Sequence, residues 1–179
     1  MSARPRPESA AEARAAVEAR RAETRAARQA EMQRRFGDGV PGRWILIASW
    51  CSTAVFTVVT VLAVVDPDRF VAAFFAVSVA LFFAGCALFV VDLVLAAGRS
   101  RDDAMGIGGL FFLAVAAPRP VQLHLLGSLA AQLVVGVAGA ATDPFTPLAF
   151  GTLVPVLALS FVGLWAVRHG LFEPIRTPG

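Results

Sequence analysis

Four polar side chains stand inside long apolar stretches of this sequence. Asp92 is the one charged residue between positions 70 and 97, and His124, Ser128 and Gln132 follow at four-residue intervals in a later stretch. Polar groups in hydrocarbon need a partner, a water-filled space or the headgroup region. A carboxylate beside an imidazole can act as a proton relay or pH sensor near neutrality. One hypothesis is therefore an intramembrane polar pair or path through these four residues.

The alternative interpretation of the same residues is structural. Asp92 lies five residues from the end of its stretch, where it can reach the headgroups or pair with Arg99, Arg101 or Arg119. In lipid, small residues and interhelical hydrogen bonds decide which helix faces meet. The candidate helix-packing residues are Ser49, Thr53, Thr57, Gly136 and Ala140. Both interpretations remain open on the sequence alone.

Patterns typical of enzymes are missing from the sequence. It contains no His-Glu-x-x-His helix, no Gly-x-Ser-x-Gly turn, no P-loop and no dinucleotide-binding glycine pattern. With two His and two Cys, few ligands are available for a buried metal. We therefore expect a non-enzymatic protein without a cofactor or metal.

The elements that position these residues are long apolar helices. Hydrophobic residues make up 57% of the 179 positions and the mean hydropathy is +0.68, which indicates a membrane protein. An uncharged stretch such as 44–65 would reach roughly 33 Å as a helix and cross a hydrocarbon core of about 30 Å. The sequence predicts an all-α, four-helix transmembrane bundle with spans at 44–65, 70–97, 121–141 and 145–167, the last bent near Pro155.

Residues 104–117 form a shorter apolar segment that ends at Pro118-Arg119-Pro120. A helix of this length reaches only about 21 Å, so we expect an interfacial or re-entrant segment. A fifth span is the alternative.

The N-terminal region differs in composition from the rest of the chain. Residues 1–42 are rich in Arg, Ala and Glu, and a helix is predicted over 9–36 with a capping box at its start and Gly37 at its end. The membrane domain is expected over 43–170, and residues 171–179 are expected to be a cytoplasmic tail.

All sixteen basic residues are Arg, and the four-span arrangement leaves Arg69 alone on the outer side. This distribution predicts a bacterial inner-membrane protein with both termini cytoplasmic and with Trp44 and Trp165 at the cytoplasmic border. Arginines at that border also suit anionic headgroups, and nucleic acid is not expected as a partner. The candidate lipid contacts are Arg34, Arg35, Arg43 and Arg119.

Several segments of the sequence resemble a known group of proteins. Pro118-Arg119-Pro120 with HLLGSLAAQ, then PFTPLAFGTLVPV and LWAVRHGLFEP, are similar to small actinobacterial multi-pass integral membrane proteins with no assigned activity. The similarity covers roughly residues 40–174. It implies a shared membrane architecture and brings no activity, cofactor or catalytic residue with it.

Taken together, these patterns favour an accessory or interaction protein that packs with itself as a homo-oligomer or with other membrane proteins. The alternative is a small transporter or channel subunit that uses Asp92, His124 and Gln132 as its polar path.

Overall fold

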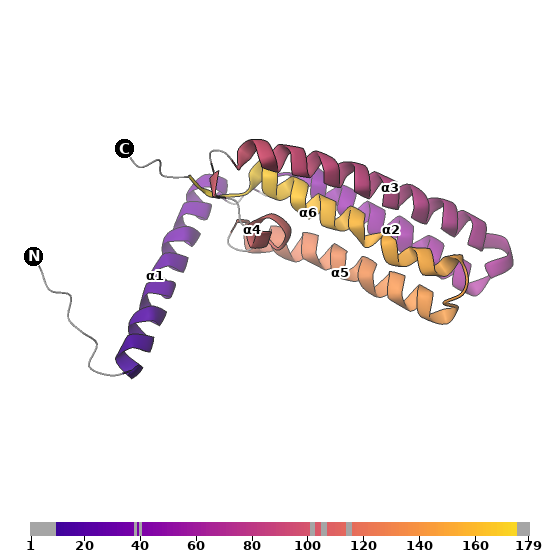
Figure 1. Cartoon of the computed structure of the whole chain (residues 1–179), viewed down its shortest axis with the longest axis horizontal. Helices are drawn as coiled ribbons and strands as arrows, with labels where there is room; N and C mark the ends of the chain where they lie inside the picture. The colour runs from indigo at the N-terminus through magenta and orange to yellow at the C-terminus, as the bar shows by residue number, and fades with distance from the viewer. Residues whose placement is uncertain are drawn as a thin grey trace, which may run out of the picture. The chain divides into compact units, whose positions relative to one another are not determined.

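The computed structural model places most of the chain in helices, which confirms the all-α class (Figure 1). It describes residues 10–37, 39, 41–100, 103–104, 107–113 and 116–174. Contacts divide the chain into two units, Met1–Gly39 and Val40–Gly179, and each is described by itself below.

The first unit is the helix predicted from the N-terminal composition. It is α1, Ala10–Phe36, and Gly37 ends it with a φ of 53° and an N–H that donates to the Gln33 carbonyl oxygen at 2.8 Å. This left-handed conformation favours glycine. Arg34 and Arg35 are exposed in the last turn, where cationic side chains suit the helix dipole. The capping residue Ser9 lies outside the described residues.

The second unit contains the four spans that the sequence predicts. Four of its helical segments are long and apolar enough to cross a membrane: Arg43–Val65, Pro67–Arg99, Arg119–Thr142 and Pro147–His169. They correspond to α2, α3, α5 and the joined segments η1 (Pro147–Leu153) and α6 (Pro155–His169). The helix α3 begins three residues before the predicted start because Asp66 Oδ1 caps it by accepting the Arg69 N–H at 3.3 Å, with Pro67 in its first turn.

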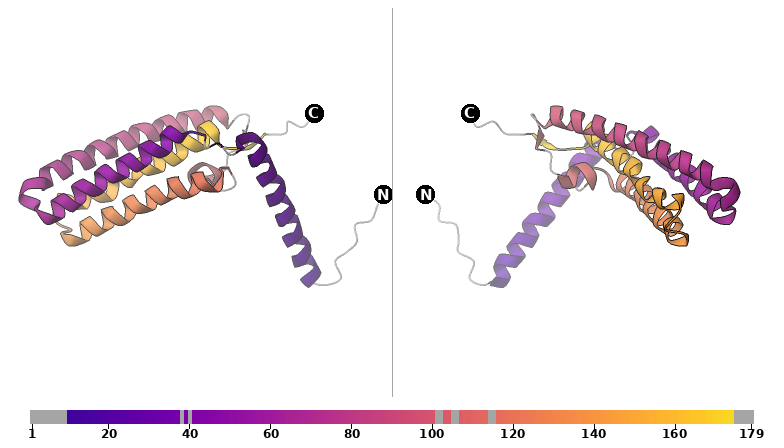
Figure 2. Two further views of the ribbon diagram at one scale, coloured as in Figure 1. Left: turned by 180° about the vertical axis from the view of Figure 1, so that it is seen from behind. Right: turned by 45° about the vertical axis from the view of Figure 1, so that its right-hand side comes forward.

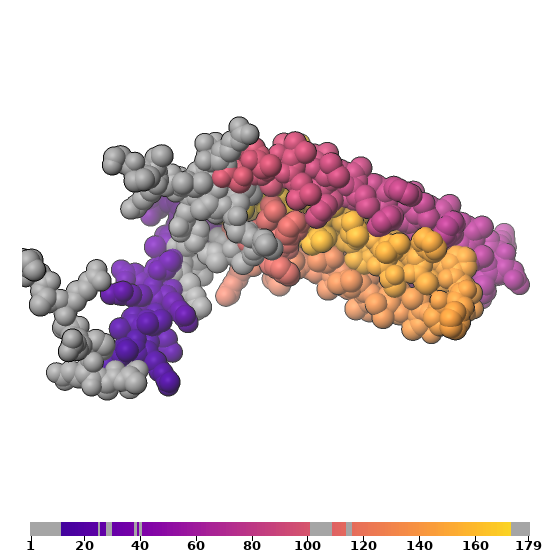
Figure 3. Space-filling model, viewed as in Figure 1, coloured from indigo at the N-terminus to yellow at the C-terminus, as the bar shows by residue number. Residues whose placement is uncertain are grey.

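At the centre of the bundle lies α6, which packs against α2, α3, α4 and α5 (Figures 1 and 2). It is buried along most of its length, whereas α3 leaves most of its surface outward. In the space-filling view, α6 is visible as a strip between α3 and α5 (Figure 3). One apolar cluster, which includes Trp165 and Leu125, fills the end near the start of α2, and a second, which includes Phe56 and Phe74, lies further along.

The predicted bend near Pro155 is a change of helix type. The 3-10 segment η1 ends at Leu153, and α6 begins at Pro155 as an α-helix. A Cβ on Gly136 of α5 would lie 2.7 Å from the carbonyl oxygen of Gly151 in η1. Glycine at position 136 therefore lets the two backbones approach closely, whereas a Cβ on Gly151 would meet the Phe74 ring at 3.1 Å.

The described residues of the segment 104–117 lie at one end of the bundle. Its helix α4 (Ile107–Phe111) has five residues and packs against α6, so it is too short to be a fifth span. Leu113, Ala116 and Ala117 are buried, and the Ala116 carbonyl accepts the Leu171 N–H at 3.0 Å. The two-residue strands β1 (Asp103–Ala104) and β2 (Glu173–Pro174) pair antiparallel.

The first residues of the predicted tail 171–179 are thereby part of the fold. Leu171 is buried, and β2 holds the chain against β1. Positions 175–179 lie outside the described residues.

Candidate functional site: the polar interior of the bundle

Hydroxyl and amide side chains of α2 and α5 meet inside the bundle. The Oγ atoms of Ser49 and Ser128 are 2.5 Å apart and buried. The Gln132 Nε2 donates to the Oγ1 of Thr53 at 2.9 Å and to the Oγ of Ser52 at 3.2 Å. The structure thus brings two of the predicted packing residues, Ser49 and Thr53, against two members of the predicted polar path.

The other predicted packing residues contribute in different ways. Thr57 is half-buried and donates to the Thr53 carbonyl oxygen at 2.8 Å, within its own helix. Gly136 is buried against η1, as described above, and Ala140 is half-buried. Thr60, the next hydroxyl of the α2 row, packs against Gly139, where a Cβ would lie 2.8 Å from the Thr60 methyl carbon.

Most of these hydroxyl groups donate within their own helix and leave an oxygen free to accept. The Thr53 Oγ1 donates to the Ser49 carbonyl oxygen at 2.9 Å while it accepts from Gln132. The Gln132 Oε1 has no hydrogen-bond partner among the described residues. The α2–α5 contact is therefore a set of direct interhelical hydrogen bonds with one acceptor, the Gln132 Oε1, left unpaired among the described residues, and such bonds are expected where apolar burial does not drive helix association.

A second polar contact, between α3 and α6, was not predicted from the sequence. Ser78, Gly85 and Asp92 are spaced seven residues apart on α3 and are all buried. The Ser160 Oγ of α6 donates to the Gly85 carbonyl oxygen at 2.9 Å. A Cβ on Gly163 of α6 would lie 2.9 Å from the Asp92 Oδ2. The seven-residue spacing is the signal that would have revealed this face.

Asp92 and His124 are not brought together. Asp92 is 1% exposed and faces α6, while His124 is exposed on α5, outside the buried stripe of that helix. Neither carboxylate oxygen of Asp92 has a hydrogen-bond partner among the described residues. Because α6 lies between α3 and α5 in the bundle, the structure places Asp92 against α6 and apart from His124, Ser128 and Gln132 of α5 (Figure 1).

Arg99 is built into the end of the bundle. Its guanidinium donates to the carbonyl oxygens of Val167 and, at 2.9 Å, Gly170, and it lies 5.2 Å above the centre of the Phe172 ring. Arg99 therefore supplies donors to the last carbonyls of α6, which have no partner within the helix. Arg101, another suggested partner of Asp92, lies outside the described residues.

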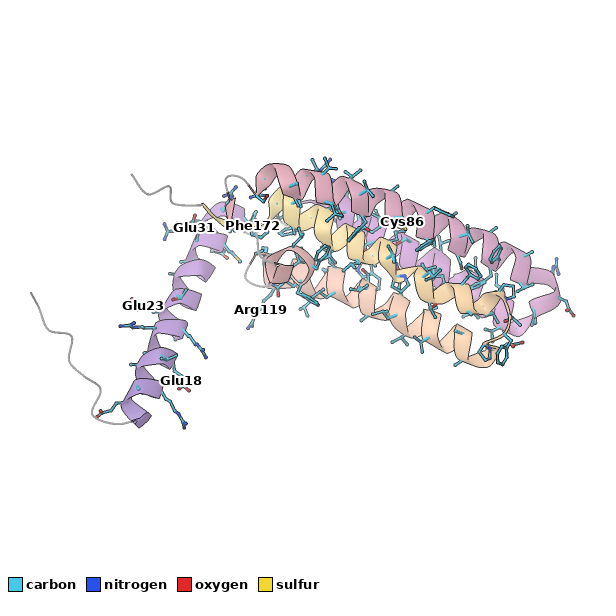
Figure 4. All side chains as sticks on the ribbon, viewed as in Figure 1. Glu18, Glu23, Glu31, Cys86, Arg119 and Phe172 are labelled. Atoms are coloured by element: carbon cyan, nitrogen blue, oxygen red, sulfur yellow. The ribbon has the colours of Figure 1, made fainter. Side chains whose placement is uncertain are left out.

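Two of the predicted lipid-contact residues are exposed at the same end of the bundle. Arg43 begins α2, and Arg119 begins α5 and points away from the bundle (Figure 4). Trp44 is half exposed, and the guanidinium carbon of Arg168 lies over its indole, 5.9 Å from the ring centre. These positions suit a headgroup region.

Trp165 lies near the end of α6 at which the cytoplasmic border is predicted, but its indole faces the interior of the bundle and not the headgroups. Its side chain is fully buried, and the Nε1 donates to the Pro41 carbonyl oxygen at 2.8 Å. The indole thereby fixes the chain just before α2 against the end of α6.

No family model, curated protein or solved structure matches this chain, so the resemblance to small actinobacterial membrane proteins stays a prediction. The fold and the site define a multi-pass helical membrane protein. Among the described residues, no group of three or more His, Cys, Asp and Glu side chains is placed to hold a metal ion.

Proposed function

We propose that this chain is a non-enzymatic accessory membrane protein that packs with itself or with other membrane proteins. The observation that carries the proposal is that polar side chains of α2 and α5 bond to one another, through the Ser49–Ser128 and Gln132–Thr53 hydrogen bonds. Polar groups that satisfy one another stabilise a helix contact and are less available to a passing solute. The outward surfaces of α2 and α3 remain apolar, with large exposed side chains that suit lipid or another helix.

Reconstitution tests this proposal against the transporter alternative. Purified protein in vesicles with an internal pH dye should give no more proton flux than empty vesicles. A flux that disappears in Gln132→Leu would contradict the accessory role and support a polar path. Purification in mild detergent should, in parallel, retain a second copy or another membrane protein in a fixed ratio. A strictly monomeric chain with nothing bound would also contradict the proposal.

The same proposal assigns α1 a tethering role at an anionic membrane surface. Arg34 and Arg35 are exposed, and in the described part of α1 Glu31 lies 3.8 Å from Arg34, in an exposed ion pair of small energetic weight. Each Arg near an anionic surface contributes about 1 kcal/mol at low salt. A peptide of residues 1–42 should float with anionic vesicles, more weakly after Arg34→Gln and Arg35→Gln, and not with neutral vesicles. Equal binding to both vesicle types would contradict the tether.

We also propose that the membrane is the bacterial inner membrane and that both termini are cytoplasmic. The support is the distribution of charge, since Arg43, Arg99, Arg119 and Arg168 belong to one end of the bundle and Arg69 to the other. Positive residues are retained on the cytoplasmic side of short loops.

A further inference from the structure

Asp92 is the one acidic residue that the structure buries among those whose exposure it describes. It is 1% exposed, and both carboxylate oxygens are without a hydrogen-bond partner in the described part of the chain. Asp92 lies inside α3 and faces the middle of α6, where backbone N–H groups bond the carbonyl oxygens of their own helix and are not available as donors to the side chain. Every other acid with described exposure, such as Asp66 or Asp143, is at the surface.

The elements packed around Asp92 bring few charges to it. On α6 the titratable residues are Arg168 and His169, on α2 they are Arg43 and Cys51, and η1 has none. Arg168 acts on the carboxyl electrostatically, but its side chain is exposed and lies over Trp44. On α3 itself, the Arg99 guanidinium is bonded to the end of α6.

The side of α6 that faces Asp92 presents a glycine, which has no charged or polar side chain. Gly163 stands opposite the carboxyl, and an added Cβ there would come within 2.9 Å of Oδ2. A glycine leaves room for the carboxyl but supplies no side-chain donor. An ionised carboxylate removed from water requires donors or a counter-charge in contact, whereas the neutral acid does not.

We propose that Asp92 is a proton-binding site inside the bundle, at which the carboxyl carries its proton while α3 is packed against α6. The ligand is a proton, and the site is formed by Asp92 and Gly163. The inference concerns a group that the Ser49–Ser128 and Gln132–Thr53 contacts do not use, so it stands or falls independently of the accessory role.

Infrared spectroscopy of the full-length protein in lipid vesicles at pH 7 tests the site. With ¹³C in the side-chain carboxyl of every Asp, a protonated Asp gives a C=O band that is separate from the carboxylate bands and from Glu. We expect this band in the wild type, its loss in Asp92→Asn, and its retention in the exposed control Asp143→Asn. Absence of the band from the wild type, or its survival in Asp92→Asn, would overturn the proposal.

A second variant keeps the test decisive if Asp92→Asn does not fold. Gly163→Ala should shift the frequency of the band, because the new methyl group must displace the carboxyl. Gly98→Ala, which adds a methyl group to α3 where no described atom lies within 4 Å, should leave the band unchanged. Equal spectra for both alanine variants would contradict the assignment of the band to the Asp92–Gly163 contact.

Discussion

Gly85 allows α3 and α6 to approach until a side chain would no longer fit between them. A Cβ on Gly85 would lie 2.7 Å from the backbone nitrogen of Leu157 and 2.9 Å from its Cα. Backbone atoms cannot rotate aside as the end of a side chain can. The short distance also allows Ser160 to bond the Gly85 carbonyl oxygen directly.

The first prediction follows from this contact. Gly85→Ala should lower the free energy of unfolding by about 1–3 kcal/mol because the two helices must separate. Gly98→Ala on the same helix is the matched control, and it should be neutral or stabilising by about 0.5–1 kcal/mol through helix propensity. Unfolding in mixed micelles with increasing SDS, followed by circular dichroism, measures both. Equal effects of the two substitutions would contradict the close contact.

A second prediction concerns the bond between Gln132 and Thr53. Thr53→Val keeps the shape of the side chain but removes the oxygen that accepts from Gln132 Nε2. A double-mutant cycle with Gln132→Met should give a coupling energy of about 0.6 kcal/mol, typical of interhelical hydrogen bonds in membranes. Thr152→Val, at an exposed residue whose hydroxyl donates to the Ala149 carbonyl oxygen in its own segment, should show no coupling to Gln132. A coupling energy of zero between Thr53→Val and Gln132→Met would contradict the bond.

At the residue scale, the sequence predicted which side chains are buried better for α5 than for α3. The i+4 series from Ser128 to Gly136 identified a buried stripe because polar and small residues stood out against Leu and Val. On α3 the surroundings are apolar on every side, so the buried face is indicated only by the seven-residue spacing of Ser78, Gly85 and Asp92. His124 was grouped with the stripe by spacing alone, yet the twist of the helix places it outside.

At the scale of elements, the end of α6 depends on a residue from another helix. Arg99, in the last turn of α3, donates to two carbonyl oxygens at the end of α6, and Gly170 bonds back to the Ala166 carbonyl oxygen at 2.8 Å. Hydrogen bonds from charged donors are the stronger kind. Phe172, two residues after Gly170, lies beside α4, since a Cβ on Gly109 would be 2.7 Å from its ring.

The third prediction tests this contact. Arg99→Gln should lower the stability by about 1.5–3 kcal/mol, the range for hydrogen bonds to charged groups, and speed amide exchange at the end of α6. Arg99→Lys should have an intermediate effect because an ammonium group lacks the planar fork. Arg69→Gln, at an exposed position in the first turn of α3, is the control. Hydrogen exchange with mass spectrometry that shows an unchanged α6 end in Arg99→Gln would contradict the role.

The sequence predicted the four spans because apolar length is a direct requirement of the bilayer. It did not predict their ends, since these depend on particular caps such as Asp66 for α3. The fold of the segment around α4 was also not predictable, because it rests on long-range contacts with Leu171 and β2.

For the whole molecule, three contacts establish which helix ends belong together. Trp165 bonds Pro41 before α2, Arg99 at the end of α3 bonds the end of α6, and Leu171 bonds Ala116 before α5. The start of α2, the end of α3, the start of α5 and the end of α6 therefore lie at one end of the bundle (Figure 2). An even number of crossings returns the chain to the side from which it started.

The fourth prediction concerns which side that is. In a Cys51→Ala, Cys86→Ala background, a single cysteine replaces one of three exposed residues. Asp68 and Asp143 lie at one end of the bundle, and Ser100 lies at the other. An impermeant maleimide applied to intact cells should label Asp68→Cys and Asp143→Cys but not Ser100→Cys, because the arginine-rich end stays in the cytoplasm. Opened cells should label all three. The reverse pattern would contradict the orientation and leave four spans intact, whereas labelling of Asp68→Cys and Ser100→Cys from the same side would contradict the crossing of α3 itself.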